Sequence, residues 1–246
     1  MISAIALILF ILLQKRKLRL TGIRAYAGVY ALGILLGLHW VAFFHAMQIS
    51  SVAVGMLALF TYPVITIILE PLFTRQRIKA RDVFAGLFML AGLAVMIGPN
   101  PTDWQDSFTL GILWGVLSAG LFALRNLFQK YHFNNVTSDS LMFHQVVTVG
   151  IMLAMFVDYP QVRMLNSLDM FKLVLLGLLS TATAHTLLSF SLKQLPAKSV
   201  ALIGCLQPVI AALLAWYVIQ ETPQLSVIIG GGMILSVSAY ESLQKR

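Results

Sequence analysis

The chain has 246 residues, of which 59% are hydrophobic and only 11% are charged. A soluble domain of this length needs far more charge to cover its surface, so the composition excludes that class and favours a membrane protein. The net charge of +8 does not indicate a nucleic-acid partner, because the basic residues lie in short loops between apolar segments.

The chain begins with a short apolar stretch, MISAIALILFILL. It is shorter than the ~20 residues that cross a bilayer core. Its basic cluster, Lys15 to Arg19, follows the stretch, whereas a signal peptide carries basic residues before it. We therefore interpret this stretch as the second half of a helix whose outer end is missing.

Eight longer apolar segments follow, and each predicts a membrane-spanning helix. Together with the first stretch they predict an all-α polytopic membrane protein with nine spans. The eight segments are 26–48, 51–73, 81–98, 108–131, 140–158, 171–190, 198–219 and 225–243.

The basic residues predict the orientation of these spans. If the N-terminus lies outside and the spans alternate, fourteen of the 17 lysines and arginines fall on inward loops. Arg163 and Lys172 fall on outward loops, and Arg125 lies within a span. Such a bias follows the positive-inside rule. We predict a multi-pass protein of the bacterial inner membrane with a cytoplasmic C-terminus.

The chain also contains an internal repeat. The segment LFTYPVITIILEPL around Pro63 recurs as GCLQPVIAALLAWY around Pro208, at an offset of 145 residues. The predicted topology places the turn at Ser50 and Ser51 outside and the equivalent turn near Pro196 inside, so the copies are inverted. We predict two repeats, 1–99 and 108–244. Inverted repeats are typical of secondary transporters that work by alternating access.

The two helix hairpins, LHWVAFFHAMQISSVAVGMLALFTYPVITIILEPLF and AHTLLSFSLKQLPAKSVALIGCLQPVIAALLAWYVIQETP, resemble those of the drug/metabolite transporter superfamily, EamA type. The family motif is a mid-helix proline, then a run ending in an acidic residue before a glycine-rich helix. Pro208, Glu221 and Gly231 match it in the second copy. In the first copy Gln76 replaces the acid.

The resemblance implies ten helices in two five-helix inverted repeats, with both termini cytoplasmic. Only four predicted helices precede residue 108, so the expected first helix is absent. Two alternatives stay open: a functional nine-span carrier, or an inactive or partner-dependent truncated fragment.

The repeat pairs four residues that are candidates for substrate binding. Trp40 is equivalent to His185, and Tyr62 is equivalent to Gln207. Inverted copies would place these residues at equivalent depths, with an aromatic wall facing a hydrogen-bonding wall around a small amphipathic metabolite. In the alternative, Trp40 and Tyr62 face lipid or pack in the bundle, and His185 bonds to a backbone carbonyl.

Polar residues also recur four apart on single spans, which places them on one helix face. Ser118, Phe122 and Asn126 form such a stripe with Arg125 beside it, and Tyr62, Thr66 and Glu70 form another. We expect Asn126 and Arg125 to bind an anionic substrate group, unless Arg125 extends to the cytoplasmic interface. For Glu70 an ion pair with Arg75 or Arg77 is favoured over proton coupling.

Pro63 and Pro208 are predicted hinges. Each lacks a backbone N–H, so each leaves a carbonyl group without its helical donor, at Leu59 and Gly204 respectively. The rival reading is simple bending for packing.

Other function classes fit less well. The sequence contains no HExxH or GxSxG motif, and its histidines lack metal-ligand spacing on any one helix, so we predict no enzyme, metal or cofactor. No filter-like loop indicates a channel. The predicted function is a carrier of small metabolites or amino acids. Its expected partners are that substrate, the lipid bilayer and, as a candidate, a coupling proton.

Overall fold

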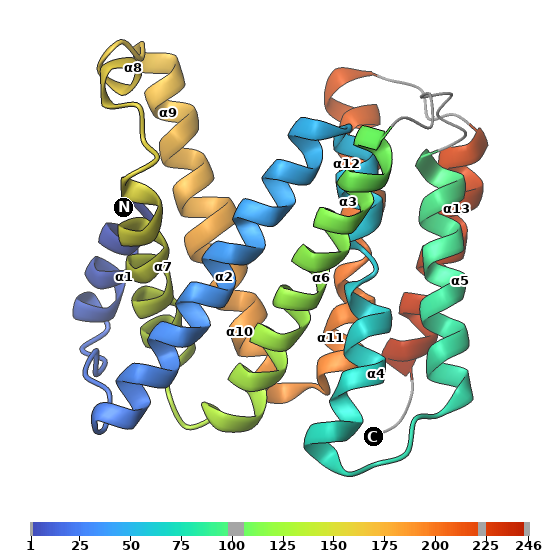
Figure 1. The fold of residues 1–246 in the computed structure, drawn as a ribbon, viewed down its shortest axis with the longest axis horizontal. Helices are drawn as coiled ribbons and strands as arrows, with labels where there is room; N and C mark the ends of the chain where they lie inside the picture. Colours follow the sequence, from blue (N-terminus) through green and yellow to red (C-terminus); the bar gives the residue numbers. More distant parts are fainter. Residues whose placement is uncertain (1, 98–105, 221–224, 244–246) are drawn as a thin grey trace. The chain divides into compact units, whose positions relative to one another are not determined.

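The computed structural model describes residues 2–97, 106–220 and 225–243, and all regular elements in these ranges are helices (Figure 1). The all-α prediction is confirmed. Glu221, the acidic residue of the family motif, lies outside the described residues. The helices are α1 (Ile2–Leu13), α2 (Ile23–Ile49), α3 (Val52–Leu59), α4 (Tyr62–Thr74), α5 (Ala80–Ile97), α6 (Asp106–His132), α7 (Ser138–Ala154), α8 (Tyr159–Arg163), α9 (Ser167–Leu175), the π-helical segment η1 (Leu176–Thr183), α10 (Ala184–Gln194), α11 (Ala197–Gly204), α12 (Gln207–Ile219) and α13 (Leu225–Leu243).

Within the described ranges, five helical segments are long and apolar enough to cross a membrane. They are Ile23–Ile49, Val54–Thr74, Thr109–His132, Ser167–Gln194 and Ala197–Val218, and Ile2–Leu13 and Leu225–Glu241 are shorter apolar helices. Three of the five contain more than one element: α3 with α4, α9 with η1 and α10, and α11 with α12 each form one span. The chain is therefore a multi-span membrane protein.

The helix bounds repeat with the offset of the sequence. Adding 145 to the bounds of α3 and α4 gives those of α11 and α12. The residues that end α4 and α12, Arg75 and Gln220, both adopt the left-handed conformation, with φ of 55° and 60°. This conformation commonly ends a helix. The sequence repeat is therefore also a structural repeat.

The helices group into two compact units, and each unit combines parts of both sequence copies. The first unit contains residues 1–38 and 128–194, and the second contains residues 39–127 and 195–246. The units group the helices by packing and do not coincide with the repeats 1–99 and 108–244, which stay a prediction.

In the first unit, α2 packs through its glycines. A Cβ atom added to Gly33 would lie 2.6 Å from Cβ of Thr148, and one added to Gly37 would lie 2.2 Å from Cε of Met152. Both partners lie on α7. The Gly33xxxGly37 motif thus allows two helices of the same chain to approach closely, which is the usual effect of small residues in membrane helices.

The loop after α1 is held by the start of α7. Arg16 Nη1 donates to Asp139 Oδ2 at 3.0 Å, Ser140 Oγ donates to the Leu18 carbonyl at 3.0 Å, and His144 Nε2 donates to the same carbonyl at 3.1 Å. Burial alone would raise the pKa of Asp139, but hydrogen bonds from Thr137, Arg16 and the Ser140 N–H hold it below its ordinary value.

The lowered pKa of Asp139 predicts an acid-sensitive contribution to stability. Above about pH 3.9, the ordinary pKa of aspartate, the contribution is fully present, and it is lost as the pH falls through the lower pKa of the folded state. We expect Asp139→Asn to remove this part of the acid dependence. Thermal unfolding in detergent between pH 3 and 7 would test it, and an unchanged pH profile in the variant would contradict it.

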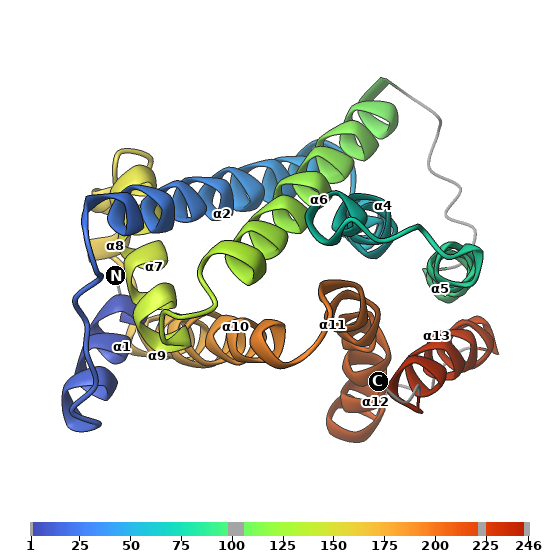
Figure 2. The same ribbon diagram turned by 90° about the horizontal axis from the view of Figure 1, so that it is seen from below.

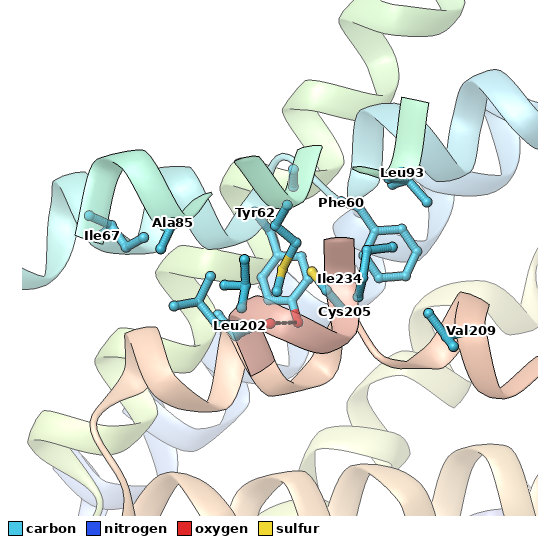
Figure 3. Close-up of a cluster of buried hydrophobic side chains, with 13 residues drawn as sticks. Phe60, Tyr62, Ile67, Ala85, Leu93, Leu202, Cys205, Val209 and Ile234 are labelled. Atoms are coloured by element: carbon cyan, nitrogen blue, oxygen red, sulfur yellow. Dashed lines mark hydrogen bonds between the residues drawn. The ribbon is translucent and has the colours of Figure 1, made fainter. Parts of the chain in front are cut away.

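In the second unit, α5 and α13 lie side by side (Figures 1 and 2). Helix α5 packs on the span formed by α3 and α4, and α13 packs on the span formed by α11 and α12. A cluster of buried apolar side chains joins these helices (Figure 3). It contains Phe60, Tyr62, Ile67, Ala85, Met89, Leu93, Ala119, Ala201, Leu202, Cys205, Val209, Ile234 and Val237. This cluster surrounds the points at which the two spans are interrupted.

Candidate functional site

Two spans are broken at equivalent positions. The first is interrupted at Phe60 and Thr61, between α3 and α4, and the second at Cys205 and Leu206, between α11 and α12. In each case a proline is the second residue of the following helix. Proline lacks an N–H and its ring clashes with the preceding turn, so a continuous helix is disfavoured at these positions. The hinge role of Pro63 and Pro208 stays a prediction.

The second break leaves a carbonyl group that the first copy binds. The N–H of Cys205 donates to the Leu202 carbonyl, three residues back, at 3.2 Å. In a regular α-helix it would donate to Ala201. Instead Tyr62 Oη donates to the Ala201 carbonyl at 2.8 Å (Figure 3). The carbonyl that the sequence predicts to be free, that of Gly204, lies three residues later and stays a prediction.

Gly204 leaves the space that the Tyr62 ring occupies. A Cβ atom on Gly204 would lie 2.3 Å from Tyr62 Oη and 3.7 Å from its Cζ atom. The first distance is far below van der Waals contact, whereas the second is an ordinary contact. The ring also makes an edge contact with Phe122, with centroids 5.2 Å apart. Tyr62 is therefore held by packing as well as by its hydrogen bond.

The polar stripe of α4 faces α11. Tyr62, Thr66 and Glu70 are all buried, as expected for residues four apart on one helix face. Tyr62 reaches the end of α11, and Glu70 reaches its beginning: Glu70 Oε1 accepts from the N–H of Ala197 at 2.7 Å, and Oε2 accepts from the N–H of Lys198 at 3.0 Å. The helices α4 and α11 are therefore antiparallel. Since α11 and α12 form one span, as α3 and α4 do, the two equivalent spans run in opposite directions. The copies are therefore inverted.

The stripe of α6 meets α2 and α4. The Nδ1–H of His39 donates to the Ser118 carbonyl at 3.1 Å, and the Ser118 hydroxyl donates to the His39 carbonyl at 3.0 Å. Since a carbonyl only accepts, this pairing places the hydrogen on Nδ1. The His39 ring stacks on Phe122 with centroids 4.6 Å apart. Phe122 thus lies in contact with the rings of both His39 and Tyr62.

Arg125 and Asn126 occupy the continuation of this helix. Arg125 is 0% exposed and Asn126 is 5% exposed. Arg125 Nη1 donates to Asn126 Oδ1 at 2.8 Å. The complete burial of the guanidinium group does not fit a side chain that extends to the membrane interface. A buried charge in a membrane span is costly to insert, and such residues commonly serve a function.

The other three predicted site residues lie in different environments. Trp40 on α2 and His185 on α10 are half-buried, and Gln207, the first residue of α12, is exposed. Gln207 therefore differs from its buried counterpart, Tyr62. His185 belongs to the first unit, whereas the other predicted site residues belong to the second. The grouping of all four around one substrate stays a prediction.

Two features of the second unit are not predicted by the sequence patterns. His39 is not among the predicted site residues, although it is buried and forms hydrogen bonds with Ser118 of α6. Glu70 was expected to pair with an arginine, and its contact with the backbone of α11 was not foreseen. One signal was available for Glu70, since the position equivalent to Ser51 is Pro196, which cannot cap a helix through its side chain.

Residues 1–98 and 109–239 match the EamA-like transporter family. The chain belongs to this family. The resemblance inferred from the two helix hairpins is therefore confirmed, and both halves of the chain match. A family of transporters, rather than an enzyme family, is indicated for a chain whose broken helices meet inside the membrane-spanning region.

Curated relatives of the chain carry transporter names. An uncharacterized transporter of Bacillus subtilis (strain 168), YxxF, is 25% identical over 217 residues, which cover 88% of this chain and 70% of the relative. The S-adenosylmethionine uptake transporter of Rickettsia felis is 24% identical over 212 residues, or 85% of this chain and 69% of the relative.

A solved crystal structure shares the fold. It superposes with a TM-score of 0.83 at 18% sequence identity, over 98% of this chain and 84% of that chain. At this identity the likeness concerns the fold alone.

Proposed function

We propose that this chain is a carrier that moves small metabolites or amino acids across the bacterial inner membrane by alternating access. The observation that carries this proposal is the pair of antiparallel broken helices at equivalent positions of an inverted repeat. Discontinuous helices of this kind form substrate sites in many secondary transporters, because their ends supply unpaired backbone groups. The excess of basic residues on the predicted inward loops supports a cytoplasmic C-terminus.

The substrate class follows from the polar groups of the second unit. Arg125 supplies a buried positive charge beside the amide of Asn126, an arrangement suited to a carboxylate. In the same unit Tyr62 and Trp40 supply aromatic surface and Gln207 is a predicted hydrogen-bonding residue, whereas His185, in the first unit, stays a separate prediction. A zwitterionic amino acid or a related metabolite fits this set. S-adenosylmethionine, named for the Rickettsia relatives, carries an amino acid group and is a member of the class.

Counterflow in proteoliposomes tests the proposal. Vesicles preloaded with an unlabelled compound would be diluted into the same labelled compound, using a panel of amino acids, S-adenosylmethionine, other metabolites and lipophilic cations. A carrier accumulates label transiently, whereas a channel lets it equilibrate without overshoot. Repeating the assay with and without a proton gradient tests proton coupling. Absence of saturable exchange for every compound, with protein that is folded and monodisperse, would contradict the proposal.

A further inference from the structure

The two equivalent helices α3 and α11 are capped in different ways. In the first copy Ser51 is the N-cap of α3, and its hydroxyl accepts from the Val54 N–H at 3.2 Å. In the second copy the N-cap is Pro196, which makes no side-chain hydrogen bond. A helix begins with N–H groups that have no partner within the helix. The first copy satisfies one of them locally, and the second copy must use another part of the fold.

Glu70 replaces the missing cap from the other copy. Its two carboxylate oxygens accept from the N–H groups of Ala197 and Lys198, the first two residues of α11, at 2.7 and 3.0 Å. Glu70 is 6% exposed, so these bonds are shielded from water. A carboxylate at a helix N-terminus is also favoured by the helix dipole. The cap of one broken helix is therefore carried by the other broken helix.

Neighbouring contacts hold the same end of α11. Lys198 Nζ pairs with Asp82 Oδ2 on α5, and Ser199 Oγ donates to Glu241 Oε1 on α13. Arg81 lies 3.7 Å from the other oxygen of Asp82. Carboxylates from three helices thus bind the first turn of α11. Among the described residues of α11, Glu70 alone of the three binds backbone groups, and it lies on the same helix as Tyr62.

We propose that Glu70 is a positioning residue that latches α11 against α4 and keeps the break at Cys205 closed. This inference rests on the proposed carrier function. The eight-residue helix α11 is fixed at its beginning by Glu70 and near its end by Tyr62. A movement that separates α11 from α4 would have to release the Glu70 cap.

Cys205 reports on this latch. It is the single cysteine of the chain, it is 2% exposed, and it lies in the break itself. Alkylation by N-ethylmaleimide in proteoliposomes therefore measures how often the break opens. We expect Glu70→Ala to raise the alkylation rate about tenfold, which corresponds to about 1.4 kcal/mol and lies within the range for loss of a helix cap. Glu70→Gln, which keeps one acceptor oxygen, should give a smaller increase, and it carries the test if Glu70→Ala does not fold.

The repeat supplies a matched rescue and a matched control. Pro196→Ser gives α11 the local cap that α3 already has, so the double variant Glu70→Ala/Pro196→Ser should return the rate to near that of the unmodified chain. Ser51→Ala removes the equivalent cap of α3 and should leave Cys205 protected. An unchanged rate in both Glu70 variants, or a failure of Pro196→Ser to lower the rate, would overturn the proposal. The readout needs no substrate, so it is independent of whether the transport proposal holds.

Discussion

Replacing Arg125 with methionine is expected to abolish transport while the protein still folds. Methionine has an unbranched apolar chain that fills much of the buried space, so packing is largely kept and only the charge is removed. Loss of one partner from a buried, hydrogen-bonded charge pair costs about 2–5 kcal/mol. If Arg125 binds a substrate carboxylate, counterflow should therefore fall by a factor of about 30 or more. The measurement is the counterflow rate per mole of reconstituted protein.

Two further variants distinguish binding from packing at this position. Arg125→Lys keeps the charge but loses the planar, bidentate group, so it should retain part of the activity. Lys172→Gln removes an exposed cation, whose ion pair with Asp169 is on the surface, and should leave counterflow unchanged. If Arg125→Met transports at the rate of the unmodified chain, Arg125 does not bind the substrate.

Gly204→Ala is expected to cause the largest loss of stability among the substitutions considered. The added Cβ would lie 2.3 Å from Tyr62 Oη, so the ring must move, and the hydrogen bond to Ala201 is lost with it. Overpacking in a core costs about 1–3 kcal/mol, and a buried carbonyl left without its donor costs a further 1–3 kcal/mol or so. The midpoint of thermal unfolding in detergent would measure the effect.

Tyr62→Phe should make the same glycine substitution tolerable. Without the hydroxyl, the nearest ring atom to the new Cβ is Cζ at 3.7 Å, which is an ordinary contact. The double variant should therefore be about as stable as Tyr62→Phe alone, and the two effects should be strongly non-additive. Additive losses would show that the clash is not with the hydroxyl and would contradict the packing described for Gly204.

The repeat in the sequence predicted the position of the broken helices well. Pro63 and Pro208 marked both interruptions, and one offset related the bounds of four helices. The reason is that proline and apolar periodicity act locally, through backbone sterics and through the length of a span. The stripe of Tyr62, Thr66 and Glu70 was also recognised, because spacing along a helix determines which side chains share a face.

The partners of those faces could not be predicted in the same way. Spacing places Glu70 on a face but does not say that this face meets the beginning of α11. It likewise did not reveal that His39 meets Ser118. These contacts depend on how helices distant in the sequence pack. The positions of Trp40 and His185 relative to a substrate depend on both units, and they stay predictions for the same reason.

The cap that Glu70 provides has a consequence for how the protein is made. The residue and the N–H group that it binds are separated by 127 positions, so α4 leaves the ribosome long before α11. Until α11 reaches α4 in the bilayer, the N–H groups of its first turn must donate to other acceptors, such as water at the membrane surface. The second copy thus relies on the first to complete one of its helices. We would expect the C-terminal half, synthesised separately, to mature only when the N-terminal half is supplied beside it.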